Sequence, residues 1–126
     1  MDASIILAVI LGEEERSEIV RVSSGYALIA PKCISWEVGN ALSACLKRRR
    51  FKLSDVLVAW ETFESISLKM SAVDISKSLE LSARFNLYAY DSYYLQAALV
   101  SQIPLLTLDQ RMLEVAKDLN IKLLEV

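Results

Sequence analysis

The sequence contains no histidine, and this absence removes several kinds of chemistry at once. Serine–histidine–aspartate triads, cysteine–histidine nucleophiles and histidine acid–base catalysis are all excluded. The two cysteines, Cys33 and Cys45, form no CxxC pair, so neither a zinc site nor a disulfide framework is indicated. This cysteine usage is typical of a reducing compartment, and we expect a cytoplasmic location. Any catalysis must therefore depend on carboxylates, hydroxyls, lysines or a metal ion.

Glycine and proline are also scarce, with three glycines and two prolines in 126 residues. They are too few for a flexible linker, and no internal repeat is visible, so the sequence predicts a single domain over residues 1–126. A chain of this length buries roughly two-thirds of the surface that its unfolded form exposes. The apolar run at residues 5–11 is too short for a membrane span or a signal sequence, and we expect no contact with a membrane.

Neither sign of charge dominates, because 14 basic residues face 16 acidic ones and the net charge is -2. This balance argues against a general polyanion-binding surface but leaves room for a local basic patch. Two interpretations of the one such patch stay open: it grips RNA phosphates, or it complements the dipole of a helix C-terminus. The patch consists of Lys47, Arg48, Arg49, Arg50 and Lys52.

Hydrophobic residues are abundant, at 54% of the chain, and the mean hydropathy is +0.35. These values predict apolar surface that a partner covers, and we expect self-association through helices near Tyr93 and Leu99. Aromatic side chains at helical spacing can stack nucleobases, but they are more often part of a core or an interface, and we favour that interpretation. The side chains concerned are Tyr88, Tyr90, Tyr93 and Tyr94.

The apolar pattern predicts strands that alternate with helices. Such alternation is typical of an α/β fold with a parallel sheet covered on both faces, in which ligands gather at the carboxyl ends of the strands. Ser54 is the expected N-cap of the helix that opens at residues 53–55, and Asp74 of the helix that follows it. The predicted strands are 27–30, 67–73, 104–108 and 120–124, and the predicted helices are 4–11, 13–22, 34–48, 53–65, 75–85, 92–102 and 110–119.

Four acidic residues, Asp2, Glu37, Asp91 and Asp109, lie where a helix begins or inside an apolar helix. If the fold brings them together, they form an oxygen-only site of the kind that Mg²⁺ and Mn²⁺ prefer. A cation would relieve their repulsion, which for two charges about 4 Å apart is on the order of 4 kcal/mol at an effective dielectric of 20. Each aspartate alone is also an ordinary N-cap, as we expect for Asp74, whereas Glu37 has no capping position. The alternative interpretation of Glu37 is a solvated side chain on the edge of its helix.

Read in order, four segments of the chain closely resemble the spaced motifs of PIN-domain ribonucleases, and in particular the toxin half of VapBC-type toxin–antitoxin pairs. The segments are Asp2–Ser4, Ser35–Leu42, Tyr88–Ala98 and Leu105–Asp109. The match keeps motif order and spacing over nearly the whole chain. The resemblance implies a three-layer α/β PIN-like domain with a short parallel sheet flanked by helices.

The resemblance further implies an endoribonuclease that depends on Mg²⁺ or Mn²⁺, acts on RNA, is neutralised by a cognate antitoxin and forms a homodimer. Asp2, Glu37 and Asp91 correspond to the core carboxylates, and Asp109 to the fourth acid. Ser4, Asn40 and Thr107 match positions that orient the acids or the metal-bound waters.

One departure from the family concerns the start of the chain. The family has a central strand of about five residues before its first aspartate, and here only Met1 precedes Asp2. Either translation starts further upstream, or the chain builds its sheet with this strand missing or truncated. In the second case the rival function is a PIN-like interaction module with an impaired metal site. A response-regulator receiver is a weaker alternative, because it requires an acidic pair where Asp2 stands alone.

Overall fold

The computed structural model describes residues 1–126 and confirms the predicted alternation of helices and strands in an α/β fold. Seven helices surround a short parallel sheet. Their order is α1 (Ala3–Ile10), α2 (Arg16–Ser23), β1 (Leu28–Pro31), α3 (Ile34–Lys47), α4 (Leu53–Ser65), β2 (Leu68–Ser71), α5 (Ile75–Phe85), α6 (Ala89–Ser101) and α7 (Gln110–Asp118).

The sheet is shorter than the sequence predicts. β1 and β2 pair in parallel, with Leu28 opposite Leu68 and Pro31 opposite Ser71. The strands expected at 104–108 and 120–124 are reduced to one parallel bridge between Leu105 and Leu123. Apolar content alone therefore overestimated the strand lengths. On one side of Leu105, Pro104 lacks a backbone N–H, and on the other side the carbonyl of Leu106 accepts from the backbone N–H of Asp2.

Met1 and Asp2 connect the two parallel pairs. The amino group of Met1 donates a hydrogen bond to the carbonyl of Ile29 at 3.0 Å, and the backbone N–H of Asp2 donates to the carbonyl of Leu106 at 3.3 Å. These two bonds lie where the resemblance leads us to expect a longer central strand. Beside them is an apolar pocket whose wall includes Met1, Ile29 and Leu106.

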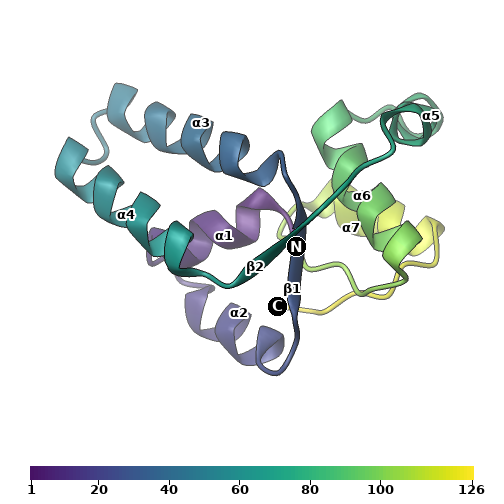
Figure 1. The fold of residues 1–126 in the computed structure, drawn as a ribbon, viewed down its shortest axis with the longest axis horizontal. Helices are drawn as coiled ribbons and strands as arrows, with labels where there is room; N and C mark the ends of the chain where they lie inside the picture. The colour runs from purple at the N-terminus through teal and green to yellow at the C-terminus, as the bar shows by residue number, and fades with distance from the viewer.

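The helices lie on both sides of the strands (Figure 1). α3 and α4 form an antiparallel pair that projects to one side, α5, α6 and α7 lie on the other side, and β1 and β2 cross the middle. The main core joins both groups, since Val38 and Leu42 of α3 belong to the same buried cluster as Leu95 of α6 and Val115 of α7. This arrangement holds the two groups of helices against each other across the centre of the molecule.

Three aspartates cap helices as expected. Asp74 caps α5 by accepting from the backbone N–H of Lys77 at 3.0 Å, and Asp109 caps α7 by accepting from that of Met112 at 2.8 Å. Asp2 occupies the N-cap of α1. Because all three are capping residues, capping by itself does not distinguish a site residue from Asp74.

Two predicted caps are wrong. The N-cap of α4 is Lys52 and not Ser54, because Asp55 accepts from the backbone N–H of Lys52 at 3.0 Å and starts the helix earlier. α6 begins at Ala89 with Tyr88 as its N-cap, so Asp91 lies inside the first turn. Asp91 therefore has no side-chain capping bond.

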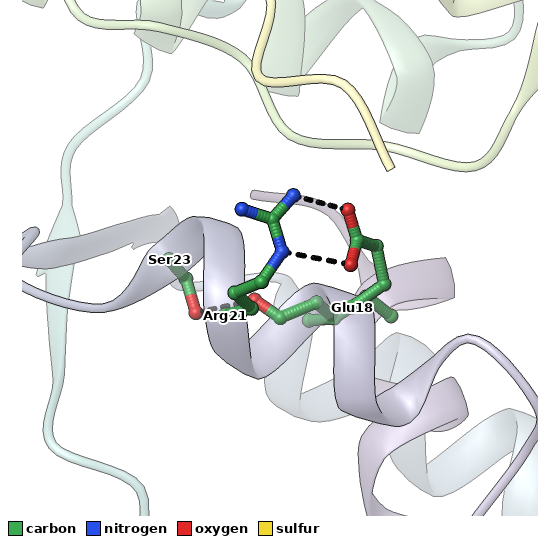
Figure 2. A network of polar contacts seen from close by, with 4 residues as sticks. Glu18, Arg21 and Ser23 are labelled. Atoms are coloured by element: carbon green, nitrogen blue, oxygen red, sulfur yellow. Dashed lines mark hydrogen bonds and ion pairs between the residues drawn. The ribbon is translucent and has the colours of Figure 1, made fainter.

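The surface of α2 carries an ion pair that has little bearing on the fold. Figure 2 shows Arg21 reaching Glu18 through two nitrogens, one of them at 2.9 Å, while the Ser23 hydroxyl donates to the carbonyl of Ile19 at 2.7 Å. Exposed pairs of this kind contribute little to stability, because water screens their attraction. None of the helices has the length and apolarity needed to span a bilayer.

We expect that adding about five apolar residues before Met1 raises the melting temperature. Such an extension can hydrogen-bond to the neighbours of Ile29 on one side and of Leu106 on the other, and can fill the apolar pocket between them. Thermal unfolding of both forms, followed by circular dichroism, tests this expectation. An extension of five serines is the control. An equal melting temperature for the apolar extension would show that Met1 and Asp2 already complete the sheet.

Candidate active site

Asp2 is buried, with 5% of its surface exposed, and both of its carboxylate oxygens accept hydrogen bonds from hydroxyl groups. The Ser4 hydroxyl donates to Oδ1 at 2.6 Å, and the Thr107 hydroxyl donates to Oδ2 at 2.6 Å. Burial raises the pKa of Asp2, while these two bonds and the Ile5 backbone N–H act in the opposite direction. The hydrogen bonds therefore fix the orientation of the carboxylate, but they do not fully offset the unfavourable effect of burial on its charged form.

Ser4 and Thr107 join Asp2 to the start of α7. The backbone N–H of Leu108 donates to the Ser4 hydroxyl at 3.1 Å, and that of Asp109 donates to the Thr107 hydroxyl at 3.0 Å. Both hydroxyls thus accept from one segment while they donate to Asp2. This geometry agrees with the orienting positions that the resemblance assigns to Ser4 and Thr107, and their role remains a prediction.

Glu37 lies in the first turn of α3, half-buried, and its Oε2 accepts a hydrogen bond from the hydroxyl of Tyr94 on α6. Burial raises the pKa of Glu37, and the charges of Asp2 and Asp91 raise it further. Burial and the bond to Glu37 also raise the pKa of Tyr94 far above its usual range, so the phenol keeps its proton. Glu37 is therefore held by a partner from another helix and is not a free side chain on a helix edge.

Tyr94 is a functional candidate that the sequence analysis placed only among core or interface aromatics. It is 3% exposed. It follows Asp91 by three residues on α6, and residues at this spacing share a helix face. That spacing is the signal in the sequence that could have identified it.

Asp91 and Asp109 complete the cluster. Burial raises the pKa of Asp91, and the negative charges of Asp109 and Asp2 raise it further. Asp109 is exposed and its Oδ1 is occupied by the Met112 backbone N–H. The structure therefore brings the four predicted acids close enough to influence one another, although they come from the start of the chain, α3, α6 and the start of α7. Asp74 exerts no such influence on them.

The donor chemistry of these residues fits a hard divalent cation, because carboxylate and hydroxyl oxygens are its preferred ligands. Burial raises the pKa values of Glu37 and Asp91, and the charges of the neighbouring acids raise them further, so a bound cation would favour the ionised carboxylates. As they stand, however, no three acidic side chains are close enough to hold one ion.

The remaining predicted residues lie along α3. Asn40 is exposed one turn after Glu37, and its carbonyl accepts from the Ser43 hydroxyl. Lys47 ends α3, and Arg48, Arg49 and Arg50 form the turn into α4, with Arg49 in a left-handed conformation (φ 53°). The basic patch therefore lies at the opposite end of α3 from Glu37. This position fits both of its interpretations.

Cys33 precedes α3 and does not supply a nucleophile. Burial and the charge of Glu37 raise the pKa of its thiol to about 11. A thiol with this pKa stays protonated near neutral pH, and the thiolate is the reactive form. The chemistry of this region therefore depends on the carboxylates.

Comparison with known proteins agrees with the fold. The family model described as the PIN domain matches residues 1–118. The chain belongs to the PIN-domain family. PIN domains are typically metal-dependent nucleases, which indicates a hydrolase that binds nucleic acid and uses a divalent metal ion.

A solved structure supports the fold. The chain is similar to PAE2754 from Pyrobaculum aerophilum, with a TM-score of 0.71 and 22% sequence identity over 90% of this chain and 75% of that chain. At this level of identity the likeness concerns the fold alone. Among curated proteins, none shows significant sequence similarity to the chain.

We expect that Asp91→Asn abolishes nuclease activity and leaves the metal-free PIN domain equally or more stable at about pH 7.5. The pKa of Asp91 is raised in the folded state, so its carboxylate opposes folding as the pH rises through that pKa. The amide removes this charge.

Melting temperatures at about pH 7.5 and about pH 4.5 test the sign, because the difference between variant and parent should shrink at the lower pH. Asp74→Asn is the matched control, since asparagine also caps a helix and Asp74 lies outside the cluster. A large loss of stability in Asp91→Asn at the higher pH would mean that the carboxylate stabilises the fold.

We expect that Tyr94→Phe weakens Mn²⁺ binding by about 10-fold or more, because residues that orient a ligand affect metal affinity to this extent. The variant removes only the hydroxyl that holds Oε2 of Glu37. Tyr93→Phe is the control, since Tyr93 packs edge-on against Tyr90 and does not act on Glu37. Isothermal titration calorimetry with Mn²⁺ measures both. Equal affinities for the two variants would exclude an orienting role for Tyr94.

Proposed function

We propose that this PIN domain is a metal-dependent endoribonuclease that hydrolyses RNA phosphodiester bonds. The observation that carries the proposal is the convergence of Asp2, Glu37, Asp91 and Asp109, which lie far apart in the sequence. In the folded chain the charges of Asp2 and Asp91 add to the raised pKa of Glu37, and those of Asp109 and Asp2 add to the raised pKa of Asp91. Buried carboxylates without a compensating positive charge oppose folding, and such groups are concentrated at functional sites. Binding a divalent cation is the purpose that fits their chemistry.

In this proposal Asp2, Glu37 and Asp91 hold Mg²⁺ or Mn²⁺, and Asp109 acts as the fourth acid. A bound divalent ion supplies a water of lowered pKa and stabilises the oxyanions of an attack at phosphorus. The protein residues orient the ligands: Ser4 and Thr107 fix both oxygens of Asp2, and Tyr94 fixes one oxygen of Glu37. Oε1 of Glu37 accepts no hydrogen bond within the protein and would be the oxygen available to the ion.

The biological role that we propose is the toxin of a toxin–antitoxin pair, as the sequence resemblance implies. A homodimer and a cognate antitoxin would cover apolar side chains that the structure leaves exposed, such as Val58 and Val100. Leu99 and Tyr93, near which we expect self-association, are half-buried beside Val100 on α6. The antitoxin and the homodimer are therefore proposed together with the toxin role.

A second candidate function is a PIN-like interaction module with an impaired catalytic site. One observation favours it: in the present arrangement no three acidic residues are close enough to share an ion. The two candidates differ in metal binding. The nuclease binds Mn²⁺ through its carboxylates, whereas the interaction module does not need to bind Mn²⁺.

We expect the purified protein to cut single-stranded RNA with Mg²⁺ or Mn²⁺ and to stop when EDTA is added, because carboxylates alone do not activate water near neutral pH. Gel electrophoresis of end-labelled RNA measures the cleavage. Asp91→Asn, purified in the same way, controls for a contaminating nuclease. Cleavage that persists in EDTA would overturn the proposal, and absence of both cleavage and Mn²⁺ binding would favour the interaction module.

A further inference from the structure

A groove of about 420 Å³ lies beside the acidic cluster, between α1 and α3. We call it the α1/α3 groove. Glu37 forms part of its wall, so the groove opens directly onto a proposed metal ligand. Its full lining is Ala3, Leu7, Trp36, Glu37, Asn40, Ala41 and Tyr90.

Two aromatic side chains border this groove and remain in water. Trp36 is 69% exposed and Tyr90 is 47% exposed. Covering a large apolar side chain is favourable relative to leaving it in water. Neither ring belongs to the buried core, although Tyr90 packs edge-on against Tyr93 with ring centroids 5.8 Å apart. The rings therefore remain available to a ligand.

The groove is aligned with the basic patch. Arg48, at the C-cap of α3, lies about three turns beyond Glu37, roughly 16 Å along the helix axis. At 100° per residue, Arg48 lies on nearly the same face of α3 as Glu37. Arg48 is exposed and forms no ion pair within the protein. A flexible polyanion that enters at the groove would therefore meet a cationic group further along the same helix face.

We propose that the α1/α3 groove binds a nucleobase of single-stranded RNA by stacking on Trp36 and Tyr90, with the RNA backbone following α3 toward Arg48. This inference rests on the proposed ribonuclease function and names the residues that hold the substrate. Stacking on aromatic rings is tolerant of sequence because every base has a π-face. The Asn40 amide, exposed in the same groove, can donate to and accept from a base edge.

The contents of the groove favour a nucleobase over a protein surface. A substrate must approach Glu37, and any occupant of this groove lies against that carboxylate. A base attached to the reacting strand can occupy the groove while its phosphate reaches the cluster. A protein that covered Trp36 and Tyr90 permanently would block this approach.

The fluorescence of Trp36 gives a direct test, because the chain has only two tryptophans. Trp60→Phe leaves Trp36 as the sole tryptophan, and Trp60 lies on α4 outside the groove. This form also carries Asp91→Asn, so that no cleavage is expected, and is titrated in Mg²⁺ with single-stranded RNA of about 12 nucleotides. We expect saturable quenching of Trp36 at the same RNA concentration at which the anisotropy of labelled RNA rises.

Two variants, Trp36→Ala and Tyr90→Ala, then measure the contribution of each ring. We expect each to weaken RNA binding by about 5-fold or more in the anisotropy titration, the range found for a lost base stack. Tyr88→Ala is the matched control. Tyr88 is the N-cap of α6, the helix that carries Tyr90, and is 87% exposed, but it does not line the groove. Circular dichroism confirms that all three variants fold.

The outcomes separate this inference from the proposed function. If the protein cleaves RNA but Trp36 is not quenched and neither alanine variant weakens binding, stacking in the groove is overturned while the nuclease stands. If the variants alter sedimentation but not RNA affinity, the groove is a contact between copies of the chain and the inference is overturned. Quenching and weakened binding without any cleavage would support the groove and count against the nuclease.

Discussion

The Asp2 carboxylate is the contact on which the arrangement of the site depends. It lies between the start of α1 and the segment that leads to α7, and one hydroxyl from each side donates to it. Those hydroxyls in turn accept the backbone N–H groups of Leu108 and Asp109. Removal of the carboxylate would leave two hydroxyls without their acceptor, one of them, from Thr107, fully inside the protein. The same side chain therefore joins the start of α1 to the segment before α7, caps α1 and is held in a fixed orientation as a proposed ligand.

The carboxylates of the site lower the stability of the folded state. Burial raises the pKa values of Asp2, Glu37 and Asp91, and the mutual repulsion of the acids adds to the shift for Glu37 and Asp91. The folded state consequently loses stability as the pH rises through these raised pKa values. Hydrogen bonds from Ser4, Thr107 and Tyr94 offset part of this loss without supplying positive charge. A compact fold that retains several repelling carboxylates at one place is typical of a functional site.

Local patterns in the sequence predicted the helices well and the pairing of strands less well. The bounds of α3 and α7 follow from apolar periodicity and from the Asp109 cap, both of which are local properties. The strands near Leu105 and Leu123 shrink to one bridge, because ladder length depends on neighbours that periodicity does not reveal. The Ser54 cap failed for a related reason: Asp55 accepts the backbone N–H of Lys52, so the N-cap lies two residues before Ser54.

The site was predictable as a set of acids but not as a geometry. Asp74 and Asp109 have the same local setting, and both cap helices, so only the fold distinguishes the acid near the cluster from the one outside it. Tyr94 shows the complementary limit, because its partner Glu37 is on a different helix and no local pattern pairs them. Spacing on α6 indicates only that Tyr94 shares a face with Asp91.

The orientation of α3 links the acidic cluster to the rest of the surface. Ile34, Val38 and Leu42 are buried on one face of this helix, which prevents it from turning about its axis. Glu37 therefore faces the cluster, while Trp36 is left exposed one residue earlier. Because the rise of the helix is fixed, the distance from Glu37 to the basic turn is also fixed. One buried stripe on α3 thus determines where a ligand acid, an aromatic ring and a cationic group stand relative to one another.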